Sequence, residues 1–203
     1  MLDGFANLPN DYLVIELNTT GLHAHDGSPP GIVEIGMARI KGRNLHGVCK
    51  FDVRPHRPIT DSARLMHGIS NQDVQQSWFR PLESVWTDVK KEVDGSNIII
   101  HNLAFDWGIL HELAQMLRLP TLAPHKTYCS YQMALAFARH RELPSASLER
   151  LSRALGLPSQ RIRGQRSAVG SAKQAHQVIE RLRDYGMLQR LPIGLPRVAT
   201  GSH

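Results

Sequence analysis

The sequence predicts an α/β domain in which helices cover a mixed β-sheet. Three apolar runs joined by short connections come first, at 12–17, 32–40 and 48–53, and short connections favour antiparallel pairing. Segment 97–100 contains three successive isoleucines, which is typical of a strand buried on both faces and hence central in the sheet. Segments with helical spacing surround and follow it. This order of elements indicates one mixed sheet with helices packed on it.

The helical periodicity is clearest in the second half of the chain. We expect helices at these segments: 71–76, 81–93, 109–117 and 132–139. Ser147 is a candidate N-cap for a further helix that begins at Leu148. The last helix has an apolar stripe made of Ala172, Ala175, Ile179 and Leu182. Beyond residue 190 the periodicity stops, so we expect one domain over 1–190 and a loose tail over 191–203.

The composition is that of a folded globular protein, with 41% hydrophobic and 21% charged residues. No stretch approaches the roughly 18 apolar residues of a membrane span, and the start lacks the pattern of a signal peptide, so we expect a cytoplasmic protein without membrane contact. Cys49 and Cys129 lie far apart and in no metal-binding spacing. They are expected to be buried thiols rather than parts of a zinc site or a disulfide.

The positive charge is concentrated in one part of the sequence. The chain has a formal charge of +6, from 24 Lys and Arg against 18 Asp and Glu. Segment 139–173 holds basic residues at Arg139, Arg141, Arg150, Arg153, Arg161, Arg163, Arg166 and Lys173, against two acids, Glu142 and Glu149. A segment of this kind suits a polyanion such as nucleic acid. A solvated helix face is the alternative interpretation.

Two polar segments lie where strands are expected to end. The first is Glu16-Leu17-Asn18-Thr19-Thr20-Gly21-Leu22, at the end of a buried strand. The second is His101-Asn102-Leu103-Ala104-Phe105-Asp106, which leads into a helix. A carboxylate near a helix N-terminus is stabilised by about 0.3–1 kcal/mol whatever else it does. The alternative interpretation of Asp106 is therefore a helix cap.

Together these segments resemble the DEDDh (DnaQ-like) 3'-5' exonuclease family, which has an RNase H-like fold. The family's first motif, Asp-x-Glu-Thr-Thr-Gly, is similar to residues 16–21, and its next strand is similar to 32–36. Its His-Gly-Ile segment resembles 65–70, and its second motif resembles 101–106. The resemblance covers about residues 11–188. It implies a five-stranded RNase H-like sheet, with three antiparallel strands followed by parallel ones and helices on its faces.

The chain departs from the family at the residues that perform the chemistry. These nucleases hold two divalent metals between four carboxylates, and a histidine deprotonates the attacking water. Glu16 replaces the first acid, Asn18 replaces the second, and Asp106 matches the third. Arg166 and Ser171 align with the general-base histidine and the last aspartate. A register one residue earlier aligns Gln165 and Gly170, which restores neither group.

These departures predict a degenerate catalytic site. Two carboxylates cannot balance two divalent ions, so we expect no cofactor or one weakly bound Mg²⁺ or Mn²⁺, held by Glu16 and Asp106. Arg166 cannot act as a base because its guanidinium stays protonated. It would instead place a fixed positive charge where active relatives hold a metal, which favours a bound phosphate. Histidines that could replace the missing base are His23, His25 and His176.

The resemblance also implies a groove for the end of a single strand. Its predicted substrate-binding residues are Thr19, Thr20, Gly21, Leu22, His67, Asn102, Phe105 and Arg166. Leu22 and Phe105 would lie near the terminal base, where stacking is worth about 1–3 kcal/mol. Both could equally be core residues.

We therefore expect a pseudo-exonuclease that binds single-stranded DNA or RNA, or 3' ends, with two-metal hydrolysis lost or severely weakened. One alternative is an active 3'-5' exonuclease with an atypical site, and whether the chain is an enzyme stays open. A second alternative is a protein-interaction module on an exonuclease scaffold. A protein partner and a homodimer are further options.

Overall fold

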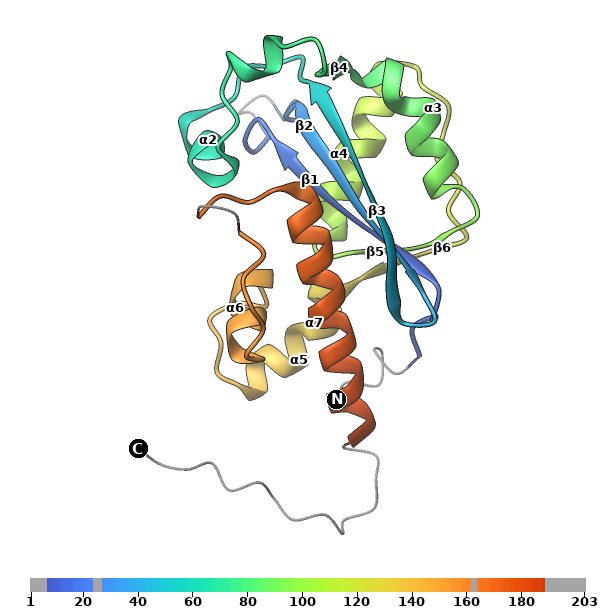
Figure 1. Ribbon diagram of the computed structural model, residues 1–203, viewed down its shortest axis with the longest axis vertical. Coiled ribbons are helices and arrows are strands. Elements are labelled where there is room, and N and C mark those ends of the chain that lie inside the picture. Colours follow the sequence, from blue (N-terminus) through green and yellow to red (C-terminus); the bar gives the residue numbers. More distant parts are fainter. Residues whose placement is uncertain (1–6, 24–26, 162–163, 189–203) are drawn as a thin grey trace.

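A mixed six-stranded sheet forms the centre of the fold (Figure 1). The computed structural model describes residues 7–23, 27–161 and 164–188. Within them the strands are β1 (Tyr12–Thr19), β2 (Ile32–Lys41), β3 (Asn44–Arg54), β4 (Arg80–Pro81), β5 (Asn97–Ile100) and β6 (Lys126–Cys129). Their spatial order is β4-β3-β2-β1-β5-β6.

The strand directions divide the sheet into two parts. β1 pairs antiparallel with β2, and β2 pairs antiparallel with β3. β5 runs parallel to β1, and β6 runs parallel to β5. The predicted antiparallel meander and the inner position of segment 97–100 are both confirmed.

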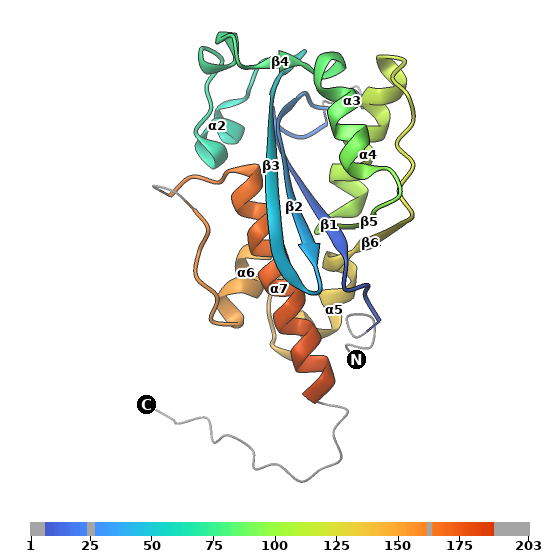
Figure 2. The same cartoon turned by 45° about the vertical axis from the view of Figure 1, so that its right-hand side comes forward.

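Helices cover both faces of the sheet. They are α2 (Asp61–His67), α3 (Leu82–Val93), α4 (Leu103–Met116), α5 (Ser130–His140), α6 (Leu148–Ala154) and α7 (Ala168–Leu188), with a short 3₁₀ turn at Asp73–Gln75. Figure 2 shows α7 against one face and α3 and α4 against the other. The period-two alternation of β1 supplies both cores: Leu13 and Ile15 pack with α3 and α4, whereas Tyr12 and Val14 pack with α5, α6 and α7.

The start of α7 lies directly on β2, and a glycine makes this approach possible. A Cβ atom on Gly36 would lie only 2.1 Å from the backbone carbon of Ala168. Two residues earlier on the same strand, buried Glu34 accepts a hydrogen bond at 3.2 Å from the Ala168 N–H, the first of the helix. Glu34 therefore satisfies a free N–H group at the helix N-terminus.

The second half of α7 is held by a polar network. The Tyr12 hydroxyl donates to Glu180 Oε1 at 2.8 Å, and Arg43 donates to the other oxygen of Glu180. Arg183 Nη2 donates to the Leu8 carbonyl at 2.7 Å. Burial, and then the nearby Glu180 charge, raises the pKa of Tyr12, so its hydroxyl stays protonated. The network ties α7 to β1, the β2–β3 turn and the segment before β1.

The predicted fold class is confirmed, with differences in detail. The sheet has one strand more than expected, because β4 adds a two-residue pairing next to β3. Helix α2 was not expected, and segment 71–76 forms only the 3₁₀ turn. Ser147 occupies the N-cap position of α6, but its side chain makes no capping hydrogen bond. The apolar stripe of α7 is buried as predicted.

The remaining expectations concern the C-terminal tail and the membrane. The predicted tail, 191–203, lies outside the described residues. None of the helices in the described part is both long and apolar enough to cross a membrane.

The contact at Gly36 yields a stability prediction. We expect Gly36→Ala to lower the free energy of unfolding by about 3 kcal/mol, because the added methyl would overlap the α7 backbone. The control is Gly47→Ala on β3, where an added Cβ meets nothing within 4 Å. This change should be nearly neutral. Urea unfolding measures the stability of both variants. Equal stabilities of Gly36→Ala and Gly47→Ala would contradict the close approach of α7 to β2 at Gly36.

Candidate functional site

The predicted site forms where β5 ends beside the parallel strand β1, which continues for several residues. Ile15 is in register with Ile100, so the next residues, Glu16 and His101, become neighbours. The His101 N–H donates to Glu16 Oε1 at 3.3 Å, and Glu16 is buried. Burial raises the pKa of Glu16 to about 7, although the Arg166 charge and the hydrogen bond from His101 oppose this change.

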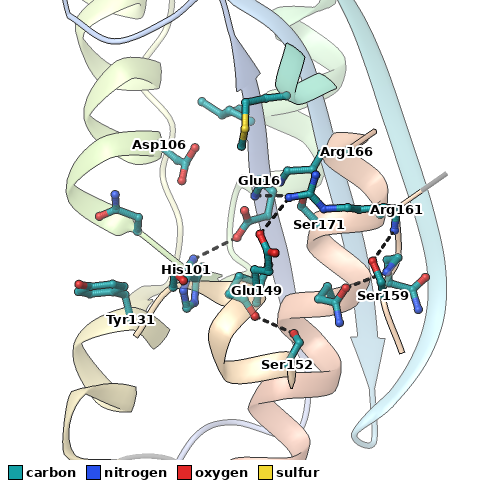
Figure 3. Close-up of a pocket in the computed structure, with 18 of the residues that line it drawn as sticks. Glu16, His101, Asp106, Tyr131, Glu149, Ser152, Ser159, Arg161, Arg166 and Ser171 are labelled. Carbon is teal, nitrogen blue, oxygen red and sulfur yellow. Dashed lines mark hydrogen bonds and ion pairs between the residues drawn. The ribbon is translucent and has the colours of Figure 1, made fainter. Parts of the chain in front are cut away.

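Asp106 approaches Glu16 from the first turn of α4. Both carboxyls are buried, and Figure 3 shows Asp106 projecting from α4 and Glu16 from β1 into the same site. Burial raises the pKa of Asp106 well above its ordinary value, and the nearby Glu16 charge raises it further. Hydrogen bonding to the Leu17 backbone and the Arg166 charge act in the opposite direction. The two acids are therefore an electrostatically unfavourable pair in the absence of a cation.

Arg166 and Ser171 complete this constellation from the start of α7. The Arg166 N–H donates to the Met66 carbonyl at 3.0 Å, which fixes the backbone before the helix. Arg166 Nη2 lies 3.4 Å from Ser171 Oγ, at the outer limit of a hydrogen bond. The guanidinium is close enough to lower the pKa of both Glu16 and Asp106. The structure thus places a permanent cation beside the two acids (Figure 3).

These side chains line one open groove of about 700 Å³. Among the predicted site residues, the lining includes Glu16, Asn102, Phe105, Asp106, Arg166 and Ser171. The remaining predicted residues, Asn18, Thr19, Thr20, Gly21, Leu22 and His67, lie outside this lining. Half of the predicted site is therefore brought together, and the other half lies near the end of β1.

Asn18 is turned toward β2 instead of the groove. It pairs with Glu34 across the two strands, and its Nδ2 donates to Glu34 Oε2 at 2.5 Å. The same nitrogen lies 3.4 Å from the Arg166 carbonyl. A neutral amide at this position therefore serves a structural purpose, because it donates to the carboxylate at the N-terminus of α7.

The residues after Asn18 shape the loop at the end of β1. The Thr20 side chain is buried and accepts from the Gly31 N–H at 2.9 Å, and the Thr20 carbonyl accepts from the Thr60 N–H at 2.9 Å. Thr19 Oγ1 donates to the Gly21 carbonyl at 2.8 Å. Leu22 is 80% exposed, which excludes the core interpretation for this side chain.

The described histidines near the site are already engaged. His67 accepts from the Ile69 N–H and donates to the Thr19 carbonyl, and burial lowers its pKa. His101 is bonded through both ring nitrogens, and burial lowers its pKa to about 4.

The candidate replacement bases do not meet in the groove either. His23 contacts Glu112 at 3.1 Å, and His176 belongs to the network around Tyr12. Neither lines the groove. His25 lies outside the described residues.

The groove also contains residues that the motifs did not indicate. They come from α2, α5, α6 and the segment after α6: Met66, Tyr131, Glu149, Ser152, Arg153, Ser159, Gln160 and Arg161, with Gln174 on α7. The charge of segment 139–173 was the available signal, since Arg153, Arg161 and Arg166 line the groove. Arg139, Arg141, Arg150 and Lys173 do not, and Arg163 lies outside the described residues.

The donor set does not fit a pair of divalent ions. Within 7–23, 27–161 and 164–188, the Asp, Glu, His and Cys side chains form no group of three or more that could hold a metal ion. Glu16 and Asp106 are two carboxylates with the positive charge of Arg166 next to them. The third acid in the groove lining, Glu149, is already ion-paired with Arg153 and Arg161. Two-metal chemistry needs more oxygen ligands and more negative charge than this groove supplies.

Comparison with solved structures supports the fold. Cell-death related nuclease 4 superimposes with a TM-score of 0.70 at 13% identity, covering 87% of this chain and 64% of that one. The nuclease domain of 3'hExo, a DEDDh family member bound to rAMP, gives a TM-score of 0.65 at 15% identity. The match covers 88% of this chain and 94% of that one. Exonuclease X in complex with 5' overhanging duplex DNA gives a TM-score of 0.59 at 23% identity. The match covers 86% of this chain and 92% of that one.

Sequence comparison identifies the family. The DNA polymerase III subunit epsilon of Rickettsia prowazekii is 33% identical over 109 residues, which cover 52% of this chain and 45% of that protein. The same subunit of Salmonella typhimurium is 29% identical over 136 residues, covering 63% and 52%. The chain spans about half the length of these curated relatives. Because the RNase T exonuclease family model matches residues 13–161, most of the described domain, this chain belongs to the DnaQ-like exonuclease family.

Proposed function

We propose that this protein binds single-stranded DNA or RNA with a 3' end in the groove, and that two-metal hydrolysis is lost or severely weakened. The observation that carries the proposal is the position of Arg166, whose charge acts on both Glu16 and Asp106. The family resemblance aligns this residue with the general-base histidine. A guanidinium cannot take a proton from water, but it binds phosphate well.

The rest of the groove suits a nucleotide. Phe105 is only partly buried and lines the cavity, as does Tyr131, which packs edge-on against His101. Aromatic faces of this kind can stack on a base of any sequence. Asn102 is exposed at the start of α4 and makes no capping hydrogen bond, so its amide is available to a ligand.

A weakened exonuclease with a single bound ion is the second candidate. The proximity of Glu16 and Asp106 favours it, because the charge of one raises the pKa of the other. A protein partner is a further proposal, since the curated relatives are named as subunits of DNA polymerase III.

The two candidates are separated by degradation of 5'-labelled single-stranded DNA and RNA with Mg²⁺ or Mn²⁺. We expect the label to stay at full length with the natural protein, as it does with a Glu16→Ala/Asp106→Ala control, while the protein still retards the same oligonucleotides. A ladder of shortened products with the natural protein alone would refute the loss of hydrolysis and establish the second candidate.

The role of Arg166 is tested by binding. We expect Arg166→Gln to weaken binding of a single-stranded oligonucleotide about tenfold, because a hydrogen bond to a charged group is worth about 1.5–3 kcal/mol. The matched control is Arg80→Gln on β4, which lies outside the groove lining. Fluorescence anisotropy at fixed salt measures both variants, and equal losses would show that only the overall charge matters.

The buried acid predicts a pH-dependent effect on stability. Burial raises the pKa of Glu16 from 4.5 to about 7, so the folded chain keeps a proton that the unfolded chain loses. The stability linked to this proton is complete below pH 4.5 and is lost as the pH rises through 7. We therefore expect Glu16→Gln to raise the free energy of unfolding by about 3 kcal/mol at pH 8 and to change it little at pH 4.5.

Urea unfolding at the two pH values measures this difference, with exposed Glu142→Gln as the control. If Glu16→Gln changes the free energy of unfolding equally at both pH values, or lowers it at pH 8, the pKa of Glu16 is not raised in the folded protein.

A further inference from the structure

We propose that Arg161 forms a second phosphate-binding site, which holds the next phosphate along the strand when the terminal nucleotide lies at Arg166. The inference rests on the proposed function and names a contact beyond it. The groove continues from Glu16 and Asp106 onto α6 and the segment that follows α6 (Figure 3). The motifs that resemble the exonuclease family leave this half of the groove without a role.

Three contacts hold Arg161 in place. Its Nη1 donates to the Gly164 carbonyl at 3.0 Å, and its Nη2 donates to Glu149 Oε2 at 3.0 Å. Its backbone N–H donates to Ser159 Oγ at 3.2 Å. The side chain nevertheless keeps 31% of its surface exposed. The guanidinium is therefore both oriented and reachable, which lowers the entropy lost when a ligand binds.

The backbone that presents Arg161 is anchored to α7. Gln174 Oε1 accepts from the Gln160 N–H at 2.9 Å, and Gln174 Nε2 donates to the Pro158 carbonyl at 2.9 Å. Gln174 is buried and also lines the groove. Because Arg166 lies two residues before α7, the same helix anchors the segments that carry both arginines.

The charge around Arg161 favours an anion. Glu149 is shared by two arginines, because its other oxygen lies 3.3 Å from Arg153 Nη2. The three side chains therefore carry a net positive charge. Glu149 is 59% exposed, and ion pairs at exposed sites are weak, so a phosphate can compete with it. A guanidinium has five N–H donors in a planar fork that matches phosphate, and the two contacts described use only part of them.

The alternative is a surface ion-pair cluster that only stabilises the segment after α6. Such a cluster would also orient Arg161. In that case, however, replacing Arg161 would change the affinity for ligands with one and with two phosphates equally. Arg150 offers a comparison on α6, the helix that carries Glu149 and Arg153. It is exposed, donates to Ser145 Oγ at 2.8 Å, and lies outside the groove lining.

Two short probes separate the phosphates. The thymidine dinucleotide TpT has one phosphate, and the trinucleotide TpTpT adds the next one. We expect Arg161→Gln to weaken binding of TpTpT about tenfold and to leave binding of TpT within about twofold, as measured by calorimetry. The salt dependence of TpTpT binding should also fall, by a slope of about 0.7. Arg161→Lys should keep this slope but recover only part of the affinity, since it loses the fork.

Arg150→Gln should change neither affinity by more than about twofold. An equal loss for TpT and TpTpT on Arg161→Gln, or no loss for either, would overturn the second phosphate site while leaving the proposed function standing. If the natural protein binds neither TpT nor TpTpT, the proposed function is overturned, and this inference with it. Melting temperatures of the variants check folding, and Arg161→Lys provides the test if Arg161→Gln does not fold.

Discussion

The contact between the start of α7 and strand β2 positions one side of the groove. Gly36 lets the helix backbone lie against the strand, and Glu34 accepts the first N–H of the helix. Gly36 also lies opposite Glu16 in the β1–β2 pairing. The same contact therefore places Arg166 and Ser171, at the start of α7, near Glu16 on β1. A wider separation between α7 and β2 would move the Arg166 guanidinium away from Glu16 and Asp106.

This arrangement also reduces the electrostatic cost of burying two acids side by side. The charge of Arg166 lowers the pKa of both Glu16 and Asp106, and thus opposes the effect of burial on each. Arg166 cannot remove the effect completely, because the pKa of both acids remains raised. A bound phosphate would sit beside a cation that is only partly neutralised by these carboxyls.

Much of the fold could be predicted from periodicity, because the sheet is buried on both faces and its strands have long apolar runs. β6 escaped prediction because Lys126–Cys129 is short and half exposed, and α2 escaped because it buries only two side chains. The motifs located the acids and Arg166. They could not locate the half of the groove at Glu149 and Arg161, because it is assembled by tertiary packing from residues with no fixed spacing.

The pairing of Asn18 with Glu34 also limits which residues position 18 can hold. An acid at this position would face the Glu34 carboxylate across the strand pair, in a place where the amide now donates at 2.5 Å. The helix cap at Ala168 depends on that same carboxylate. An acid at position 18 would therefore destabilise the β1–β2 pairing and the start of α7 together, so the stability of the fold constrains this residue even though it does not line the groove.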